Sequence, residues 1–156
     1  MDNSNSISCP CGSLNNYSDC CGKYINSQKA PSAEALMRSR YTAYTLKNEI
    51  YLLNSWHPST RPKNLNLYND KTCWKGLKII SATKNQVSFV AYFINEDDPS
   101  EKTLFALYEE SAFIKEQNWL YSHGVNLNRV VLTKNQFCPC KSGKKFKRCC
   151  EKLFTA

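Results

Sequence analysis

Apolar side chains at helical spacing predict an amphipathic helix in the first third of the chain. The stripe recurs every three or four residues and consists of Leu36, Met37, Tyr41 and Tyr44. Ser32 precedes it in the position of an N-cap, and Glu34 places negative charge in the first turn, where a helix favours it. Arg38 and Arg40 lie mostly off the stripe. We interpret them as solvated or ion-paired helix surface, with a charge contact to the cysteine-rich segments or to a ligand as the alternative.

A second, shorter helix is predicted directly afterwards. Asn48 can cap it, and it should cover residues 49–55. Its predicted inward-facing side chains are Ile50, Leu53 and Trp56. Pro58 and Pro62 then end the helix and impose a loop, because proline cannot continue a helix and restricts the residue before it.

The pattern changes to strands after residue 74. Runs rich in β-branched and aromatic residues cover 77–80, 87–94, 103–115 and 119–123. The segments between them carry turn residues and cover 84–85, 95–100 and 116–118. Short turns between neighbouring strands predict an antiparallel meander. Helices followed by strands predict an α+β fold.

Eight of the nine cysteines fall into two blocks with the same spacing. Each block reads Cys-Pro-Cys, then eight residues, then Cys-Cys, and the eight are Cys9, Cys11, Cys20, Cys21, Cys138, Cys140, Cys149 and Cys150. In both blocks a Ser follows the first Cys by four positions, an aromatic residue by eight and a Lys by fourteen. We infer an internal repeat. Its copies are called here the N-terminal knuckle (residues 8–23) and the C-terminal knuckle (residues 137–152).

Four thiolates at this spacing suit a structural zinc ion in each knuckle, because four cysteine ligands close a tetrahedral shell. The vicinal pair is a less common bite than Cys-x-x-Cys, so Cys21 and Cys150 are the less secure ligands. Disulfides are the competing interpretation and would suit a small secreted protein. Residues 1–8 are polar and lack the features of a signal peptide, so we favour zinc and a cytoplasmic location.

These motifs resemble a known family. The spacing is similar to the SEC-C motif, a small zinc-binding module in which the last ligand is often His, whereas this chain has Cys at both ends. The C-terminal copy, CPCKSGKKFKRCC, is the closer match. Two copies around a middle region with ALMRSRYTAY, YLLNSWHPSTRP, VSFVAYF and WLYSHG resemble the YchJ family. The resemblance implies a nuclear-transport-factor-two-like middle domain, in which N-terminal helices pack in a curved, cone-like antiparallel sheet. We therefore expect domains at 1–27, 28–130 and 131–156.

The middle region offers few catalytic groups. His57 and His123 are the chain's two histidines, and each could act as a general base if a carboxylate such as Glu109 oriented it. A structural or surface histidine is the simpler interpretation. Together with Trp56, these residues form our candidate cavity set. Cys73 lies outside the repeat, and we interpret it as a small buried residue. Phosphate-binding glycine loops are absent from the sequence, which argues against nucleotide-dependent catalysis.

Charge is concentrated at the C-terminal end. The chain has a net charge of +8, and residues 129–156 hold eight Lys or Arg against one Glu. Within the C-terminal knuckle, Phe146 is surrounded by Lys144, Lys145, Lys147 and Arg148. These five residues can dock on an acidic protein surface or grip phosphate and stack a base, or the cations can offset the charge of a zinc–thiolate centre.

We therefore expect a zinc-binding adaptor and favour an acidic protein partner over nucleic acid. No membrane partner is expected, because the apolar runs are too short to span a bilayer. The alternative function is a small-molecule binder or acid–base enzyme that uses a cavity of the middle domain. Between the two functions we favour the adaptor, which is not an enzyme.

Overall fold

The computed structural model describes residues 6–98 and 103–154. In this part of the chain a four-stranded antiparallel sheet has the order β1-β2-β3-β4, and the strands are β1 (Thr72–Ala82), β2 (Gln86–Asn95), β3 (Phe105–Lys115) and β4 (Trp119–Val131). The α-helices are α1 (Cys21–Ser27), α2 (Ala33–Thr45) and α3 (Glu49–Asn54). Short 3-10 turns are η1 (Tyr17–Asp19), η2 (Leu67–Asn69), η3 (Phe146–Arg148) and η4 (Cys150–Leu153). The α+β fold is confirmed; the cone shape stays a prediction.

Both predicted helices begin at the predicted caps. The Ser32 side chain accepts a hydrogen bond from the Ala35 amide, and the Asn48 side chain accepts one from the Tyr51 amide. The predicted inward face of α3 is wrong at Ile50, which is 74% exposed. Tyr51 and Leu52 are the buried residues of this helix. Helix α1 was not predicted. None of the described helices is long and apolar enough to cross a membrane.

The meander is confirmed, with its first and last strands longer than predicted. β1 covers Thr72–Ala82 where 77–80 was predicted. β4 continues eight residues beyond His123, to Val131. Its pairing with β3 is irregular between Tyr108 and Glu110 and again between Ala112 and Phe113. Such bulges bend and twist a strand, so they change where its side chains point. Residues 99–100 of the predicted turn lie outside the described residues.

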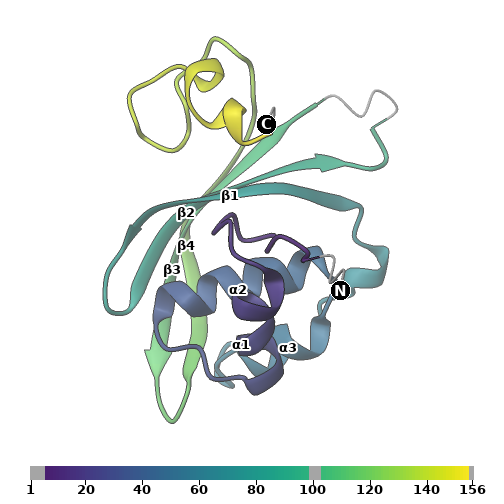
Figure 1. Ribbon diagram of the computed structural model, residues 1–156, viewed down its shortest axis with the longest axis vertical. Helices are drawn as coiled ribbons and strands as arrows, with labels where there is room; N and C mark the ends of the chain where they lie inside the picture. The colour runs from purple at the N-terminus through teal and green to yellow at the C-terminus, as the bar shows by residue number, and fades with distance from the viewer. Residues whose placement is uncertain (1–5, 99–102, 155–156) are drawn as a thin grey trace, which may run out of the picture.

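Strand β2 is covered on both faces, so the sheet lies between two layers. Alternate residues Phe89 and Ala91 pack with the helices, whereas Val90 and Tyr92 pack with the C-terminal knuckle. Figure 1 shows the helices on one side of the sheet and the C-terminal segment on the other. The two knuckles therefore lie on opposite faces of the same sheet.

Candidate functional site

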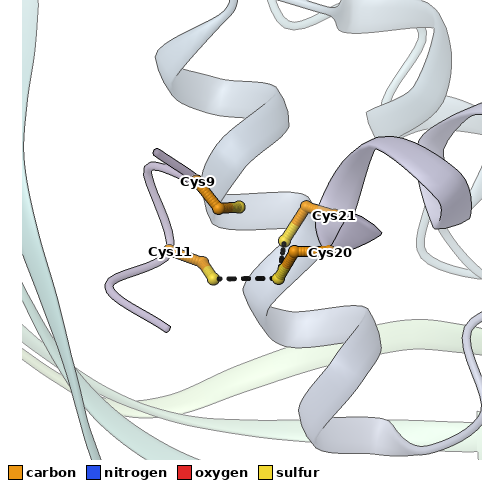
Figure 2. Close-up of side chains that lie close together, drawn as sticks. All are labelled: Cys9, Cys11, Cys20 and Cys21. Carbon is orange, nitrogen blue, oxygen red and sulfur yellow. Dashed lines mark hydrogen bonds between the residues drawn. The ribbon is translucent and has the colours of Figure 1, made fainter. Parts of the chain in front are cut away.

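The N-terminal knuckle brings together four cysteines from two short segments. Cys9 and Cys11 lie on the loop before η1, and Cys20 and Cys21 lie at the start of α1. Figure 2 shows their side chains gathered around one point. The Sγ atom of Cys20 lies 3.6 Å from that of Cys11 and 4.0 Å from that of Cys21, and all four ligand atoms lie within 4.8 Å of one another.

The C-terminal knuckle repeats this geometry with Cys138, Cys140, Cys149 and Cys150. The Sγ of Cys149 lies 3.5 Å from that of Cys140 and 4.0 Å from that of Cys150. In each tetrad the first, second and fourth cysteines are buried and the third is half-buried. The repeat inferred from the sequence is therefore also a repeat in structure.

The backbone of the two knuckles follows the same course. Both place a left-handed residue three and five positions after the first cysteine, and one of the two is glycine in each copy. These are Gly12 (φ 78°) and Leu14 (φ 66°) in the N-terminal copy, and Lys141 (φ 62°) and Gly143 (φ 77°) in the C-terminal copy. Two left-handed residues turn the chain sharply, which brings the Cys-x-Cys pair onto the vicinal pair.

A serine contacts the third cysteine in each knuckle. Ser13 Oγ lies 3.2 Å from the Cys20 sulfur, and Ser142 Oγ lies 3.2 Å from the Cys149 sulfur. Each hydroxyl also accepts a backbone N–H, so it is oriented to donate to a thiolate. A hydrogen bond from Cys21, opposed by burial, lowers the pKa of Cys11 to about 4, and the same hydrogen bond raises the pKa of Cys21. Metal binding by the whole tetrad would therefore have to release the proton of Cys21.

The donor set fits a tetrahedral metal ion. Four thiolates about 2.3 Å from a zinc ion stand about 3.8 Å apart, and the sulfur pairs above lie between 3.5 and 4.0 Å apart. Both tetrads can therefore hold a metal without large rearrangement. With four protein ligands the coordination shell is closed, which leaves no position for a reacting water.

The N-terminal knuckle is part of the main core. The Cys9 sulfur lies 3.8 Å from Thr42 Oγ1, and Arg38 Nη1 donates a hydrogen bond to the Cys11 carbonyl oxygen. Three of the four cysteines belong to the same buried cluster as Leu36. The sequence suggested a separate appendage, but the knuckle's sulfurs pack directly on α2. Arg38 both contacts the knuckle and pairs with Glu34 at 3.1 Å, so its two predicted roles are both met.

The C-terminal knuckle is anchored on the outer face of the sheet by aromatic rings. Phe146 is only 3% exposed, and its ring centroid lies 6.0 Å from that of Tyr92 and 6.3 Å from that of Phe154. The Tyr92 hydroxyl reaches the Cys138 sulfur at 3.7 Å, and burial raises the pKa of this phenol. The prediction that Phe146 contacts a partner is therefore wrong, because its ring is enclosed.

The basic side chains around Phe146 are exposed. Lys144, Lys145, Lys147 and Arg148 all face solvent, and none forms an ion pair with a described residue. The Lys145 ammonium lies 4.1 Å from the ring centroid of Phe137, which is 67% exposed. The corresponding N-terminal positions are Asn15, Asn16, Ser18 and Asp19. Cationic charge therefore distinguishes the two copies.

A cavity of about 350 Å³ lies between α2 and the inner face of the sheet. Its lining combines aromatic side chains with a few polar ones. The polar and charged residues are Arg40, Asp70, Thr72, Glu109, Ser111 and Arg129, and the tyrosines are Tyr41, Tyr44 and Tyr121. This is the size and character of a small-molecule site.

Arg40 is buried at this cavity, contrary to its predicted place on the helix surface. It is 5% exposed, and its Nη1 donates to the Leu52 carbonyl and to Ser55 Oγ, both at 2.7 Å. Its guanidinium lies against the paired rings of Trp56 and Tyr121, 4.9 and 4.5 Å from their centroids. Burial lowers the pKa of Arg40, and the nearby tyrosines and Glu109 oppose that shift.

Glu109 is the one member of the predicted cavity set that lines the cavity. Its Oε1 accepts hydrogen bonds from Ser111 Oγ (2.8 Å) and Tyr121 Oη (3.1 Å). A methyl group added at Gly124 would overlap the Glu109 carboxyl group, so glycine is required there for this orientation. The carboxyl group is thus held on the sheet side of the cavity.

The other predicted cavity residues lie elsewhere. His57 lies on the loop after α3, where Nε2 is 3.0 Å from Glu116 and Nδ1 is 2.6 Å from Ser59. His123 is exposed on β4. Trp56 packs behind Arg40, and its Nε1 is buried without a hydrogen-bond partner among the described residues. No histidine therefore meets Glu109.

Cys73 lies on β1, half-buried rather than buried as predicted.

One sequence signal could have identified Arg40. The interpretation that Arg40 lies mostly off the apolar stripe is wrong, because it lies four residues after Leu36 and four before Tyr44, on the same face of α2. A charged residue at such a position must be buried or must distort the packing. Glu109 carries the equivalent signal in β3, since it alternates with Leu107 on the inner face.

Comparison of this chain with known protein families and structures agrees with this architecture. The family described as "YchJ, middle NTF2-like domain" matches residues 32–124, and the SEC-C motif matches residues 135–152. A UPF0225 protein of Enterobacter sp. (strain 638) is 42% identical over 154 residues, which covers 91% of this chain and 96% of the relative. A UPF0225 protein of Yersinia pestis (strain Pestoides F) is 39% identical with the same coverage.

Two solved structures are similar to this fold. A SEC-C motif containing protein from Rhodopseudomonas palustris has a TM-score of 0.64 at 30% identity and covers 78% of this chain and 100% of its own. One from Psychrobacter arcticus has a TM-score of 0.59 at 29% identity and covers 94% and 97%. Fold and site thus define a SEC-C motif protein with an NTF2-like middle domain. This chain belongs to the YchJ family.

The shared cores generate a prediction about stability. Cys9→Ser and Cys138→Ser should each lower the free energy of unfolding of the whole chain by at least about 2 kcal/mol, because each breaks a buried metal site that packs on the sheet or on α2. Urea unfolding followed by circular dichroism measures this. Cys73→Ser is the matched control, since it removes a thiol outside the tetrads. Unchanged unfolding of the middle region in both knuckle variants would show that the knuckles are independent of the core.

Proposed function

We propose that this protein is a zinc-binding adaptor whose basic C-terminal knuckle docks on an acidic protein surface. The supporting observation is the contrast between the two knuckles. They share one metal-binding geometry, yet the C-terminal copy alone carries four exposed cations at the positions of Asn15, Asn16, Ser18 and Asp19. Metal binding by itself therefore does not require those cations, and their presence calls for a separate role.

The anchoring of the C-terminal knuckle supports a docking role. Phe146 fixes the loop on Tyr92, and closure by a metal would hold the same segment from within. Charges on a rigid turn lose less conformational freedom on binding than charges on a loose tail. The knuckle can thus present its cations at low entropic cost.

A protein partner fits this surface better than nucleic acid. The ring that was expected to stack a base, Phe146, is enclosed. The exposed ring is Phe137, and Lys145 already lies over one of its faces. An apolar side chain surrounded by cations suits an acidic segment that also carries an apolar anchor.

Zinc is the proposed metal, and the reducing cytoplasm is the proposed compartment. Four thiolates at tetrahedral spacing match the ligand preference of zinc. The same cysteines would oxidise readily in a disulfide-forming compartment if the metal were lost. Both knuckles are assigned structural sites, because four cysteine ligands would complete each coordination shell.

The metal proposal predicts two zinc ions per chain in protein purified under reducing conditions without chelators. Inductively coupled plasma mass spectrometry gives the stoichiometry, and a parallel titration of free thiols detects oxidation. Cys138→Ser should retain one zinc ion, held by the N-terminal tetrad. Trace zinc in fully reduced, folded protein would contradict the assignment.

The docking proposal predicts that replacing Lys144, Lys145, Lys147 and Arg148 with Gln abolishes partner capture and leaves the zinc content unchanged, since none of them is a ligand. The measurement is affinity capture from cell extract over a range of salt concentrations, because screening weakens exposed charge pairs. The matched control replaces Lys23, Lys29, Lys63 and Lys71, which are exposed lysines outside the C-terminal knuckle. Equal capture by the quadruple variant and the parent would contradict the proposal.

The same variants distinguish a protein from nucleic acid. Binding to a fluorescent single-stranded oligonucleotide through four phosphate contacts should give a slope of about −3 in log affinity against log salt. Binding to an acidic protein partner should give a shallower slope. This binding should be lost when the acidic patch of the partner is neutralised. A steep slope with the oligonucleotide would reassign the surface to nucleic acid.

A further inference from the structure

The cavity between α2 and the sheet is enclosed at one end and open at the other. Its inner walls include Phe89 and Phe113, which are 5% and 3% exposed, whereas Leu127 is 60% exposed and Arg129 faces solvent. A molecule entering between Leu127 and Arg129 would move from a polar rim into a mostly aromatic interior. The cavity is on the face of the sheet opposite the basic knuckle, so its occupant is independent of the docking function.

Arg40 is a buried cation that has no ion pair among the described residues. A buried charge without an opposite charge is costly. Two hydrogen bonds and two aromatic rings offset part of this cost. Both hydrogen bonds come from Nη1, whereas a guanidinium has five N–H donors. A third hydrogen bond goes to the Tyr44 hydroxyl, so two of the five donors remain for an anion in the cavity.

Glu109 lines the same cavity without pairing with Arg40. Its Oε1 is fixed by Ser111 and Tyr121, and its position over Gly124 keeps the carboxyl group in place. Two opposite charges that line one cavity and do not contact each other leave space for a molecule between them. That molecule should offer an acceptor to Arg40 and a donor to Glu109.

The rest of the cavity wall is largely aromatic, which defines the body of the ligand. Tyr41, Tyr44 and Trp74 line the cavity together, and the rings of Tyr41 and Tyr44 lie 6.0 and 6.4 Å from that of Trp74. Aromatic walls favour a flat, apolar ring, which they contact by edge or face. One deeply buried arginine matches one carboxylate in a bidentate pair. A phosphate dianion fits less well, because Glu109 and Asp70 also line the cavity.

We propose that this cavity binds a small aromatic monocarboxylate that carries a hydroxyl or amino group at its far end. The carboxylate pairs with Arg40, the ring lies among Tyr41, Tyr44 and Trp74, and the hydroxyl or amino group donates to Glu109. This assigns the middle domain a ligand-binding role that is separate from the adaptor function of the C-terminal knuckle.

Met37 provides a direct probe of this cavity. The chain has two methionines, Met1 and Met37, and Met37 lines the cavity. Methyl-labelled methionine therefore reports the cavity by NMR with a single core signal. The probes are 4-hydroxyphenylacetate, its neutral amide, and phenylacetate, each titrated into the zinc-loaded full chain. We expect saturable shifts of the Met37 signal with 4-hydroxyphenylacetate, and at least about tenfold weaker binding of the amide, because the amide cannot form the charged pair.

Two substitutions assign the ends of the ligand. Arg40→Gln should weaken 4-hydroxyphenylacetate at least about tenfold and leave the amide unaffected. Glu109→Gln should weaken 4-hydroxyphenylacetate more than phenylacetate, which lacks the hydroxyl group. Arg148→Gln is the matched control, because it removes the same charge from an exposed site on the opposite face of the sheet. If Arg40→Gln fails to fold, the comparison of acid with amide on the parent protein still decides.

Equal affinity for the acid and the amide would overturn the assignment of Arg40 as the carboxylate anchor. Absence of any Met37 shift with the acids, up to their solubility limit, would overturn the ligand class altogether. Neither result would affect capture by the C-terminal knuckle, so the two functions are tested separately.

Discussion

Burial of β2 on both faces is the constraint that organises this fold. Val87, Val90 and Tyr92 are fully buried, and Phe89, Ala91 and Phe93 nearly so. A four-stranded sheet with one apolar face needs one covering layer, but a strand that is apolar on both faces needs two. The helices and the N-terminal knuckle supply one layer. The C-terminal knuckle, through Phe146, supplies the other together with Phe154, which follows it.

The duplicated knuckle meets these two demands with one local structure. Its backbone and sulfur geometry are the same in both copies, and its surroundings differ. The N-terminal copy packs its sulfurs on α2, and α1 continues from its last cysteine into the core. The C-terminal copy packs one ring on the sheet and leaves its lysines in solvent. One copy thus completes the core, and the other combines covering the sheet with presenting charge.

Local signals predicted the local structure well. Ser32 and Asn48 cap their helices because their side chains reach amide groups three residues ahead, which depends on nearby sequence alone. The thiol spacing predicted both tetrads for the same reason. The predicted helix face of Ile50 and the exposure of Phe146 were wrong, because each depends on which distant element covers the residue. The hydrophobicity of a side chain predicts that it prefers burial, but it does not predict which surface buries it.

The candidate cavity shows the same limit from the opposite direction. Glu109 was identified as a candidate, but its proposed histidine partners lie outside the cavity. His57 contacts the carboxyl group of Glu116, which follows β3, and not that of Glu109. Arg40 was assigned to the surface because charged side chains are usually exposed to solvent. Its position within an apolar stripe argued otherwise, and the structure shows the consequence.

Strand β3 connects the two regions to which we assign functions. Glu109 and Ser111 face the cavity, whereas Tyr108 accepts a hydrogen bond from Lys141 of the C-terminal knuckle. Because side chains alternate along a strand, these neighbours lie on opposite faces of the sheet. A substitution on one face therefore changes the contacts of one region and leaves those of the other unchanged. The same strand also fixes both in space, because β3 pairs along its length with β2 and β4. A rigid sheet thus lets a buried cavity and an exposed basic surface differ in chemistry while they depend on a single fold.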